Sequence, residues 1–170
     1  MTATTITLSE DELCAAFAEE AKETPLFSEW LIRATKFADH ATGARLLHEE
    51  QRTIRPRKHW WRHWWCHVPE LNKDRETDIF LVYEKADGSR FACHVEAKLG
   101  KGRFEVGQAE GYEVRARHMA NNPKYLNYSE YETILIAPQS FMNRYAAECS
   151  HFGVCISFED LADRIAVFEM

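Results

Sequence analysis

The first part of the chain has the hydrophobic spacing of amphipathic helices. Ser9 and Glu12 form the pattern of a capping box, which predicts that a helix begins at residue 10. After Pro25, hydrophobic residues recur at helical spacing, and Pro56 closes this part of the pattern. The predicted helices span residues 10–22, 26–40 and 44–52.

The rest of the chain alternates short apolar runs with helical segments. The runs over 77–84 and 90–98 flank a DGS sequence at 87–89. Because glycine supplies the positive φ of a tight turn, these runs predict an antiparallel hairpin. The runs over 132–138 and 153–158 are typical of strands buried on both faces of a sheet. This order predicts an α/β domain with a mixed sheet. Further helices are expected over 106–120, 140–150 and 159–165.

The composition is that of an ordinary globular protein. Its 170 residues suit one domain, over residues 1–170, with a sizeable core. Hydrophobic residues make up 45% of the sequence and charged residues 28%, and the formal net charge is −6. The whole surface of an acidic chain does not attract nucleic acid, so such binding would need a local basic patch.

Cysteine usage and the N-terminal sequence bear on location. The five cysteines include no CxxC pair, which argues against a zinc ribbon, and their odd number argues against a closed disulfide framework. Residues 1–13 lack a basic segment followed by an apolar one, so we expect no signal peptide. No run approaches the ~18 apolar residues of a membrane span. We therefore expect a cytoplasmic protein in a reducing compartment.

The stretch over 55–70 interleaves aromatic and basic residues. Four tryptophans and three histidines fall within 59–67. On a helix, His59, His63 and His67 would share one face and suggest a metal site. Tryptophans favour strands, however, and in a strand these histidines lie too far apart to share one ion. We favour an aromatic cluster that covers the sheet, with a surface for phosphates and bases as the alternative.

Three charged residues interrupt the predicted hairpin, although buried charges are costly unless they are paired or bound to a metal. Because side chains alternate along a strand, Glu96 and Lys98 point to the same side. Counting outward from the turn places Asp78 opposite positions 96–98, so the three groups converge at the open end of the hairpin. Two carboxylates are hard oxygen ligands for Mg²⁺, and a lysine beside them could orient water or neutralise charge. The alternative is a solvated ion pair at a strand edge.

Around these residues the sequence resembles the PD-(D/E)XK nuclease superfamily. The pattern of that family is an acid at the start of a strand, a hairpin, (D/E)-x-K and then a helix. Asp78 matches the first acid, although Thr77 precedes it where the family pattern has proline. Glu96-Ala97-Lys98 matches the second element.

A second match lies on the helix that follows. QAEGY, residues 108–112, is similar to the Gln-x-x-x-Tyr motif of the branch related to recombination exonucleases and to many phage, repair and defence nucleases. The four-residue spacing places Gln108 and Tyr112 on one helical face, which Arg115 extends. This face would position the lysine or contact phosphate.

The resemblance implies a restriction-endonuclease-like fold, a three-layer α/β domain in which helices flank a mixed central sheet. It also implies a phosphodiesterase that cleaves DNA with Mg²⁺, for which Mn²⁺ could substitute. The metal ligands that it implies are Asp78, Glu96 and the carbonyl of Ala97. The catalytic residues that it implies are Asp78, Glu96, Lys98, Gln108 and Tyr112.

The family also has an acid on its first core helix that completes the metal site. The candidates are Glu29, Glu49 and Glu50, and of these we favour Glu29. The residues expected to contact nucleic acid are Arg57, Lys58, Arg62, Lys101 and Arg115.

Two other functions stay open. A protein of this fold could bind nucleic acid or a protein partner without cutting, although members that lost activity usually lose the acid or the lysine, which this chain keeps. In a third hypothesis the acids and the lysine occur by chance in an unrelated α/β protein. A small stand-alone member resembles a phage, plasmid or genome-defence nuclease. Such nucleases often form homodimers, and RNA is an alternative substrate.

Overall fold

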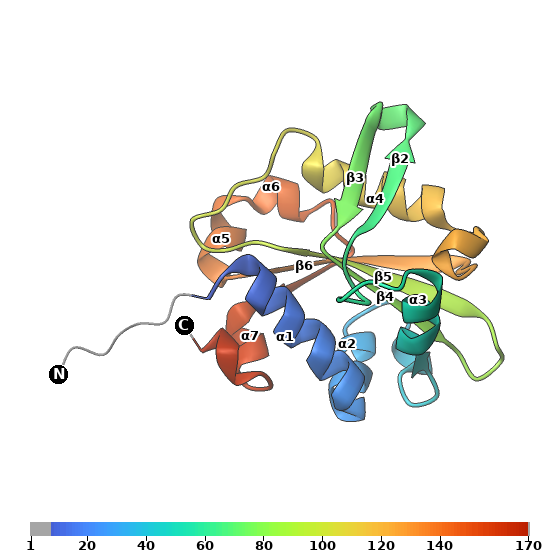
Figure 1. Ribbon diagram of the computed structural model, residues 1–170. Coiled ribbons are helices and arrows are strands. Elements are labelled where there is room, and N and C mark those ends of the chain that lie inside the picture. Colours follow the sequence, from blue (N-terminus) through green and yellow to red (C-terminus); the bar gives the residue numbers. More distant parts are fainter. Residues whose placement is uncertain (1–7, 170) are drawn as a thin grey trace.

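A five-stranded mixed sheet lies at the centre of the computed structural model, which describes residues 8–169 (Figure 1). The strand order is β1-β4-β5-β6-β7. The pairs β1–β4 and β4–β5 are antiparallel, and the pairs β5–β6 and β6–β7 are parallel. The prediction of a mixed α/β fold is therefore confirmed. The strands are β1 (Arg45–Leu46), β4 (Ile79–Glu84), β5 (Arg90–Ala97), β6 (Glu130–Ala137) and β7 (Val154–Ser157).

Helices cover both faces of the sheet (Figure 1). One face packs against α1 (Glu10–Glu23), α2 (Pro25–Arg33) and α7 (Phe158–Ala162). The opposite face packs against α4 (Gln108–Met119), α5 (Gln139–Arg144) and α6 (Ala146–Cys149). Within residues 8–169, no helix is both long and apolar enough to cross a membrane. The remaining helix is α3 (His48–Ile54), and the 3₁₀ turns are η1 (Ala38–His40), η2 (Pro69–Leu71), η3 (Pro123–Tyr125) and η4 (Ala166–Phe168).

The central strands are buried on both faces. Ile134 and Ile136 of β6 belong to the core under α1 and α2, whereas Leu135 belongs to the core under α4 and α5. This agrees with the uniformly apolar run from which the strand was predicted. The run over 153–158 differs, because β7 is an edge strand and its Cys155 is exposed.

The predicted hairpin is present, with Gly88 at a φ of 85° in its turn. The capping box at the start of α1 is also present, because the Ser9 side chain accepts a hydrogen bond from the Glu12 amide. The predicted second helix is too long, since α2 ends at Arg33. The hydroxyl of Thr35 donates to the Ile32 carbonyl at 2.7 Å, and such a local bond competes with helical pairing.

Residues 44–52 form strand β1 and then helix α3, rather than the single helix predicted. The Gln51 side chain explains how α3 packs at this edge. Its Nε2 donates to the Phe80 carbonyl at 2.8 Å, and its Oε1 accepts from the Val82 amide at 2.9 Å. A buried amide side chain thus satisfies backbone groups of β4 that a neighbouring strand would otherwise pair.

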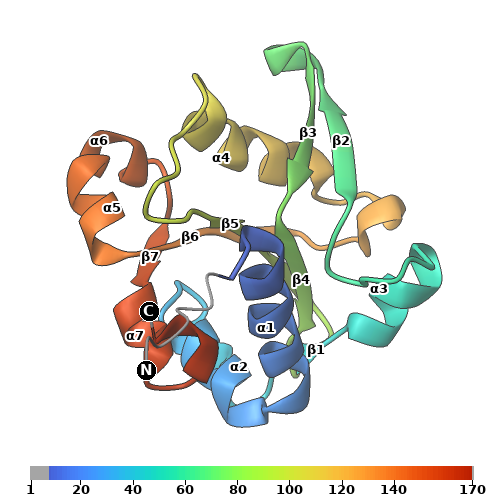
Figure 2. The ribbon, with the colours of Figure 1, turned by 60° about the vertical axis from the view of Figure 1, so that its left-hand side comes forward.

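A second, two-stranded sheet was not predicted. The strands β2 (Trp64–Val68) and β3 (Lys73–Thr77) pair in antiparallel register and project beyond the start of β4 (Figure 2). The sequence of β3, KDRET, has no alternation of apolar and polar residues, so the hydrophobic pattern did not predict a strand there. The hairpin turns at Asn72, a residue with a φ of 47° that tolerates the left-handed conformation.

Candidate active site

The two predicted acids of the hairpin lie together where β4 begins and β5 ends. Ile79 pairs with Val95, which sets Asp78 opposite Glu96, as counting from the turn suggested. The Ala97 amide donates to Asp78 Oδ2 at 3.0 Å and so fixes that carboxylate beside β5. The structure therefore brings Asp78 and Glu96 to the same end of the sheet.

Glu96 is held by three side chains. It is 1% exposed, and its Oε1 accepts hydrogen bonds from Gln108 Nε2 and Lys98 Nζ, each at 2.7 Å. Its Oε2 accepts a hydrogen bond from the Tyr112 hydroxyl. Both residues of the Gln-x-x-x-Tyr motif thus reach the same carboxylate, because the four-residue spacing stacks them on the face of α4 that packs on the sheet.

Asp78 and Glu96 place two carboxylates close together where little water reaches them. Burial raises the pKa of Asp78 well above its usual range, and the nearby charge of Glu96 raises it further. Burial lowers the pKa of Lys98, but the charges of Glu96 and Asp78 outweigh burial and raise it overall. Lys98 is therefore protonated at neutral pH and offsets part of the carboxylate charge.

A third acid near these carboxylates, Glu10, was missed by the sequence reasoning. Glu10 lies in the first turn of α1 and lines a cavity of about 40 Å³ together with Asp78. Burial raises the pKa of Glu10, the charge of Lys98 lowers it, and the charge of Glu96 adds to the increase. The cavity has room for a water molecule or a small ion. The capping box was the available signal, because it placed Glu10 at the first position of the first core helix.

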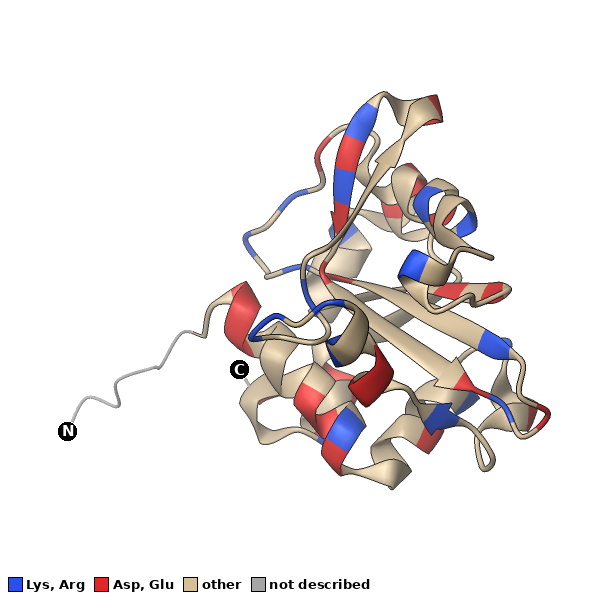
Figure 3. Cartoon of the chain, turned by 45° about the vertical axis from the view of Figure 1, so that its right-hand side comes forward, with Lys and Arg blue, Asp and Glu red and all other residues tan. Residues whose placement is uncertain are grey.

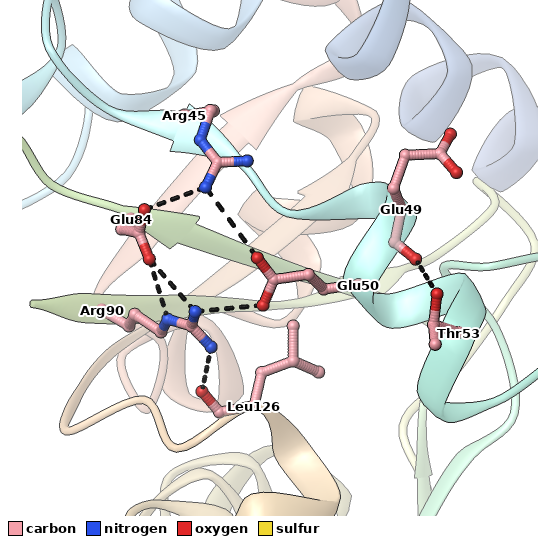
Figure 4. Close-up of polar contacts among 7 residues, drawn as sticks. All are labelled: Arg45, Glu49, Glu50, Thr53, Glu84, Arg90 and Leu126. Atoms are coloured by element: carbon pink, nitrogen blue, oxygen red, sulfur yellow. Dashed lines mark hydrogen bonds and ion pairs between the residues drawn. The ribbon is translucent and has the colours of Figure 1, made fainter. Parts of the chain in front are cut away.

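The three acids that had been proposed for this place lie elsewhere. Glu29 lines a separate cavity on the α2 side and faces Arg33 at 3.9 Å. Glu50 contacts Arg90 at 3.0 Å, at the turn end of the hairpin (Figure 4). Glu49 pairs with Arg52 at 3.1 Å. Each of these acids has a basic partner of its own, and among the N-terminal acids it is Glu10 that lies near Asp78.

Arg115 lies beneath this site rather than on the surface. It is 2% exposed, and its guanidinium lies 4.0 Å from the centre of the Tyr112 ring. Its Nε donates to the Thr77 hydroxyl at 3.0 Å, and that hydroxyl lies 3.0 Å from His94 Nδ1. His94 Nε2 lies 3.1 Å from the hydroxyl of Tyr128. This buried chain of polar contacts ties α4 to β3 and β5.

The aromatic stretch covers the sheet, as favoured from the sequence. Trp60, Trp61 and Trp64 are at most 2% exposed, so they are not available to stack on bases. Trp65 is 47% exposed and is the exception. Of the three histidines in this stretch, His63 lies 2.9 Å from Glu76 and His67 pairs with Asp74.

The other basic residues expected to contact nucleic acid differ in their surroundings. Arg62 pairs with Asp11 at 2.8 Å and lines the cavity that Glu10 and Asp78 share. Arg57 and Lys58 are exposed in the segment before β2. Lys101 is exposed in the loop between β5 and α4, which carries several basic positions near the acidic first turn of α1 (Figure 3).

The donor atoms of the site suit a hard divalent cation. Asp78, Glu96 and Glu10 offer carboxylate oxygens, and when all are ionised Lys98 balances only one of the three charges. As the side chains stand, residues 8–169 contain no set of three His, Cys, Asp or Glu arranged to hold a metal ion. Glu96 Oε1 already accepts two hydrogen bonds, so its remaining capacity lies mainly on Oε2.

Comparison with models of known protein families, with curated proteins and with solved structures finds no match for this chain.

Proposed function

We propose that the chain is a Mg²⁺-dependent nuclease of the PD-(D/E)XK type, with a restriction-endonuclease-like fold, that hydrolyses phosphodiester bonds in DNA. The observation that carries the proposal is the set of contacts around Glu96. Its carboxylate is held by Gln108, Tyr112 and Lys98 and lies beside Asp78. A solvated ion pair at a strand edge would be exposed and would not need these contacts. The burial of Glu96 and its four polar neighbours therefore support a functional site.

The metal would be held by Asp78, Glu96 and Glu10, with the Ala97 carbonyl as a further ligand. A bound Mg²⁺ would polarise the phosphoryl group and lower the pKa of a bound water. Burial and then the charge of Glu96 raise the pKa of Asp78, and a bound cation would offset both effects by stabilising the ionised carboxylates. Mn²⁺, which also prefers oxygen ligands, would substitute for Mg²⁺.

The protein's own side chains would orient this chemistry. Gln108 and Tyr112 fix the Glu96 carboxylate, so that it needs little reorganisation when substrate binds. Lys98 stays protonated, and its ammonium would hold a phosphoryl oxygen and stabilise the charge that develops there. The surrounding basic positions, Arg57, Lys58, Arg62 and Lys101, would guide the phosphate backbone to an otherwise acidic protein.

The test is an incubation of the purified protein with single-stranded DNA, plasmid and RNA in Mg²⁺, Mn²⁺ or EDTA. DNA cleavage is expected with either metal and not in EDTA. Glu96→Ala should abolish cleavage. Its circular dichroism spectrum is recorded beside the assay, because the change relieves repulsion with Asp78 but leaves Gln108, Tyr112 and Lys98 without their shared acceptor. Glu110→Ala, which removes an exposed acid of the same helix α4 that faces His151 at 3.6 Å, is the matched control and should cleave normally.

The alternative is a nuclease-fold protein that binds nucleic acid or a protein partner without cutting. Tight DNA binding by the wild-type protein, without cleavage under any of these conditions, would support that alternative. Cleavage that persists in EDTA or in Glu96→Ala would contradict the proposal. A role in phage, plasmid or genome defence, the cytoplasmic location and a homodimer remain predictions.

A further inference from the structure

Arg115 is a buried cation for which the proposed reaction has no role. It lies on α4 and is 2% exposed, so its guanidinium is not available to the phosphates of bound DNA. Among residues 8–169 its Nε has a hydrogen-bond partner and its Nη2 has none. Buried ionic groups often stabilise a fold no more than apolar residues of similar volume would. Stability alone therefore does not explain why this position carries a cation.

The Tyr112 ring connects Arg115 to the candidate site. The guanidinium carbon of Arg115 lies 4.0 Å from the centre of this ring, within the range of a cation–π attraction. The Tyr112 hydroxyl donates to the Glu96 carboxylate and accepts a hydrogen bond from the Asp78 amide at 3.5 Å. One aromatic side chain thus joins Arg115 to both of the acids of the β4–β5 hairpin that are proposed as metal ligands.

The charge of Arg115 also acts on the Tyr112 hydroxyl. Burial and then the charges of Asp78 and Glu96 raise the pKa of Tyr112 well above its usual range, whereas the charge of Arg115 lowers it. The hydroxyl therefore stays protonated and can donate, and the nearby cation makes it a stronger donor than it would otherwise be. Arg115 in this way strengthens the hydrogen bond that fixes Glu96.

A chain of hydrogen bonds holds the guanidinium in place. The Tyr128 hydroxyl donates to the Ala116 carbonyl, so it accepts from His94 Nε2 at 3.1 Å. Burial lowers the pKa of His94 well below its usual value, and the charge of Arg115 lowers it further. The His94 ring is therefore neutral, and its Nδ1 accepts from the Thr77 hydroxyl at 3.0 Å. That hydroxyl accepts from Arg115 Nε at 3.0 Å, so the chain begins at Arg115 and ends at the next residue of α4.

We propose that Arg115 is a positioning residue that holds Tyr112, and through the Tyr112 hydroxyl the Glu96 carboxylate, in the geometry that cleavage requires. This inference rests on the proposed function, and it extends that function to a residue that contacts neither the metal nor the DNA. The contacts of Arg115 come from within the protein, so the geometry is set before substrate binds. A group that orients a metal ligand in this way affects the rate of the reaction rather than the affinity for DNA.

The test measures single-turnover DNA cleavage beside DNA binding by fluorescence anisotropy in Ca²⁺. Arg115→Met removes the charge and keeps a long side chain, and circular dichroism shows whether the variant folds. Its bound DNA should be cleaved about tenfold more slowly, with an unchanged dissociation constant for DNA. Arg117→Met, at an exposed position of the same helix, is the matched control and should equal wild-type protein in both measurements. A wild-type cleavage rate in folded Arg115→Met, or weaker DNA binding with an unchanged rate, would overturn the inference.

Tyr112→Phe decides whether Arg115 acts through the Tyr112 hydroxyl. When Tyr112→Phe is already present, Arg115→Met should lower the cleavage rate by less than about twofold, because residues that act through one another are not additive. An equal loss in both backgrounds would show another route and overturn the inference. Arg115→Lys keeps a charge but not the flat guanidinium, so its rate should lie between those of wild-type protein and Arg115→Met. Arg115→Lys takes the place of Arg115→Met in this comparison if the latter does not fold.

The proton resonance of the Tyr112 hydroxyl provides a measurement that does not depend on cleavage. A buried, hydrogen-bonded hydroxyl proton exchanges slowly with water, and its loss in Tyr112→Phe assigns the resonance. The resonance should be lost in Arg115→Met and kept in Arg117→Met. An unchanged resonance in Arg115→Met would overturn the inference and leave the nuclease intact. Loss of the resonance in Arg115→Met, in a protein that never cleaves DNA, would support the link from Arg115 to Glu96 and contradict the proposed function.

Discussion

Glu96 is the residue of the candidate site with the most side-chain contacts to the other site residues. Its two oxygens accept hydrogen bonds from α4 and from Lys98, the residue that follows β5, so its position depends on both. Asp78 is fixed differently, by a backbone amide of β5. Glu10 approaches from α1 and completes a group of three acids beside one lysine. The proposed roles of these residues can be separated by substitution.

Glu10 should be needed for cleavage, and Glu29 should not. We expect Glu10→Gln to lower the cleavage rate by about 10-fold to 100-fold, because it weakens the metal site. The melting temperature should not fall, since the change removes a charge from a crowded acidic site. Glu29→Gln is the matched control, a change in the other N-terminal helix that removes only a contact with Arg33. A wild-type rate in Glu10→Gln, or a loss of activity in Glu29→Gln, would contradict this assignment.

Lys98 should act as a charged group and not as a proton acceptor. Lys98→Ala and Lys98→Arg should both cleave about 100-fold more slowly than wild-type protein. Alanine removes a preorganised hydrogen-bond donor, a loss that has an effect of this size. Arginine keeps the charge, but its planar guanidinium does not fit the place of the ammonium group. Both variants should still bind DNA and metal. The measurement is single-turnover cleavage beside a binding assay. If Lys98→Ala loses DNA binding while its bound fraction cleaves at the wild-type rate, Lys98 is a substrate anchor instead.

At this scale the sequence predicted contacts within one hairpin or one helix turn. The places of Asp78 and Glu96 follow from strand alternation and turn position, and those of Gln108 and Tyr112 from helical spacing. Glu10 was not found because its position depends on how α1 packs across the sheet, which no local pattern determines.

The β4–β5 hairpin has the candidate site at its open end and a network of ion pairs at its turn end. There Arg90 donates to Glu84 at 3.1 Å and to the Leu126 carbonyl at 3.0 Å, and it forms an ion pair with Glu50 at 3.0 Å (Figure 4). Arg45 reaches Glu84 at 2.9 Å. These contacts join α3, both hairpin strands and the end of η3, away from the acids of the site.

Substitutions at the turn end of the β4–β5 hairpin should therefore lower the stability of the protein without changing its cleavage rate. Arg90→Met should lower the free energy of unfolding by about 1–2 kcal/mol, because a partly buried charged donor with three acceptors is lost. The cleavage rate per folded molecule should not change. Arg45→Met removes a more exposed arginine from the same network and should lower stability by less than about 0.5 kcal/mol. Denaturant unfolding and the cleavage rate are the measurements. A loss of cleavage in folded Arg90→Met would show that the two ends of the hairpin are coupled.

The elements that the sequence predicted are those with an apolar pattern of their own. β4 is an almost continuous apolar run, β6 ends in one, and β5 is mostly apolar although it contains His94 and Glu96; the capping box fixed the start of α1. β3 was missed because its stability comes from pairing with β2 and not from its own side chains. β1 was missed because it has only two residues and lies next to α3.

The whole molecule brings four separate parts of the chain to one end of the sheet. These parts are the first turn of α1, the projecting β2–β3 hairpin, the loop after β5 and the start of α4 (Figures 1 and 2). The sequence predicted the α/β class but not this convergence, because it depends on crossovers between distant elements. Asp78, Glu96 and Glu10 gather there with Lys98 and Arg62, a mixture of charges that suits the metal and the phosphate of the proposed function.

The most direct test of the central claim is the Mg²⁺ dependence of single-turnover DNA cleavage in wild-type protein and in Asp78→Asn. Asp78→Asn keeps the size of the side chain and removes the charge that would bind the metal. Wild-type protein should cleave an end-labelled oligonucleotide in Mg²⁺ and not in EDTA, and Asp78→Asn should cleave at least about 100-fold more slowly at the same Mg²⁺ concentration. Equal rates for the two proteins, or wild-type cleavage that EDTA does not stop, would contradict the claim that these acids form a metal-dependent nuclease site.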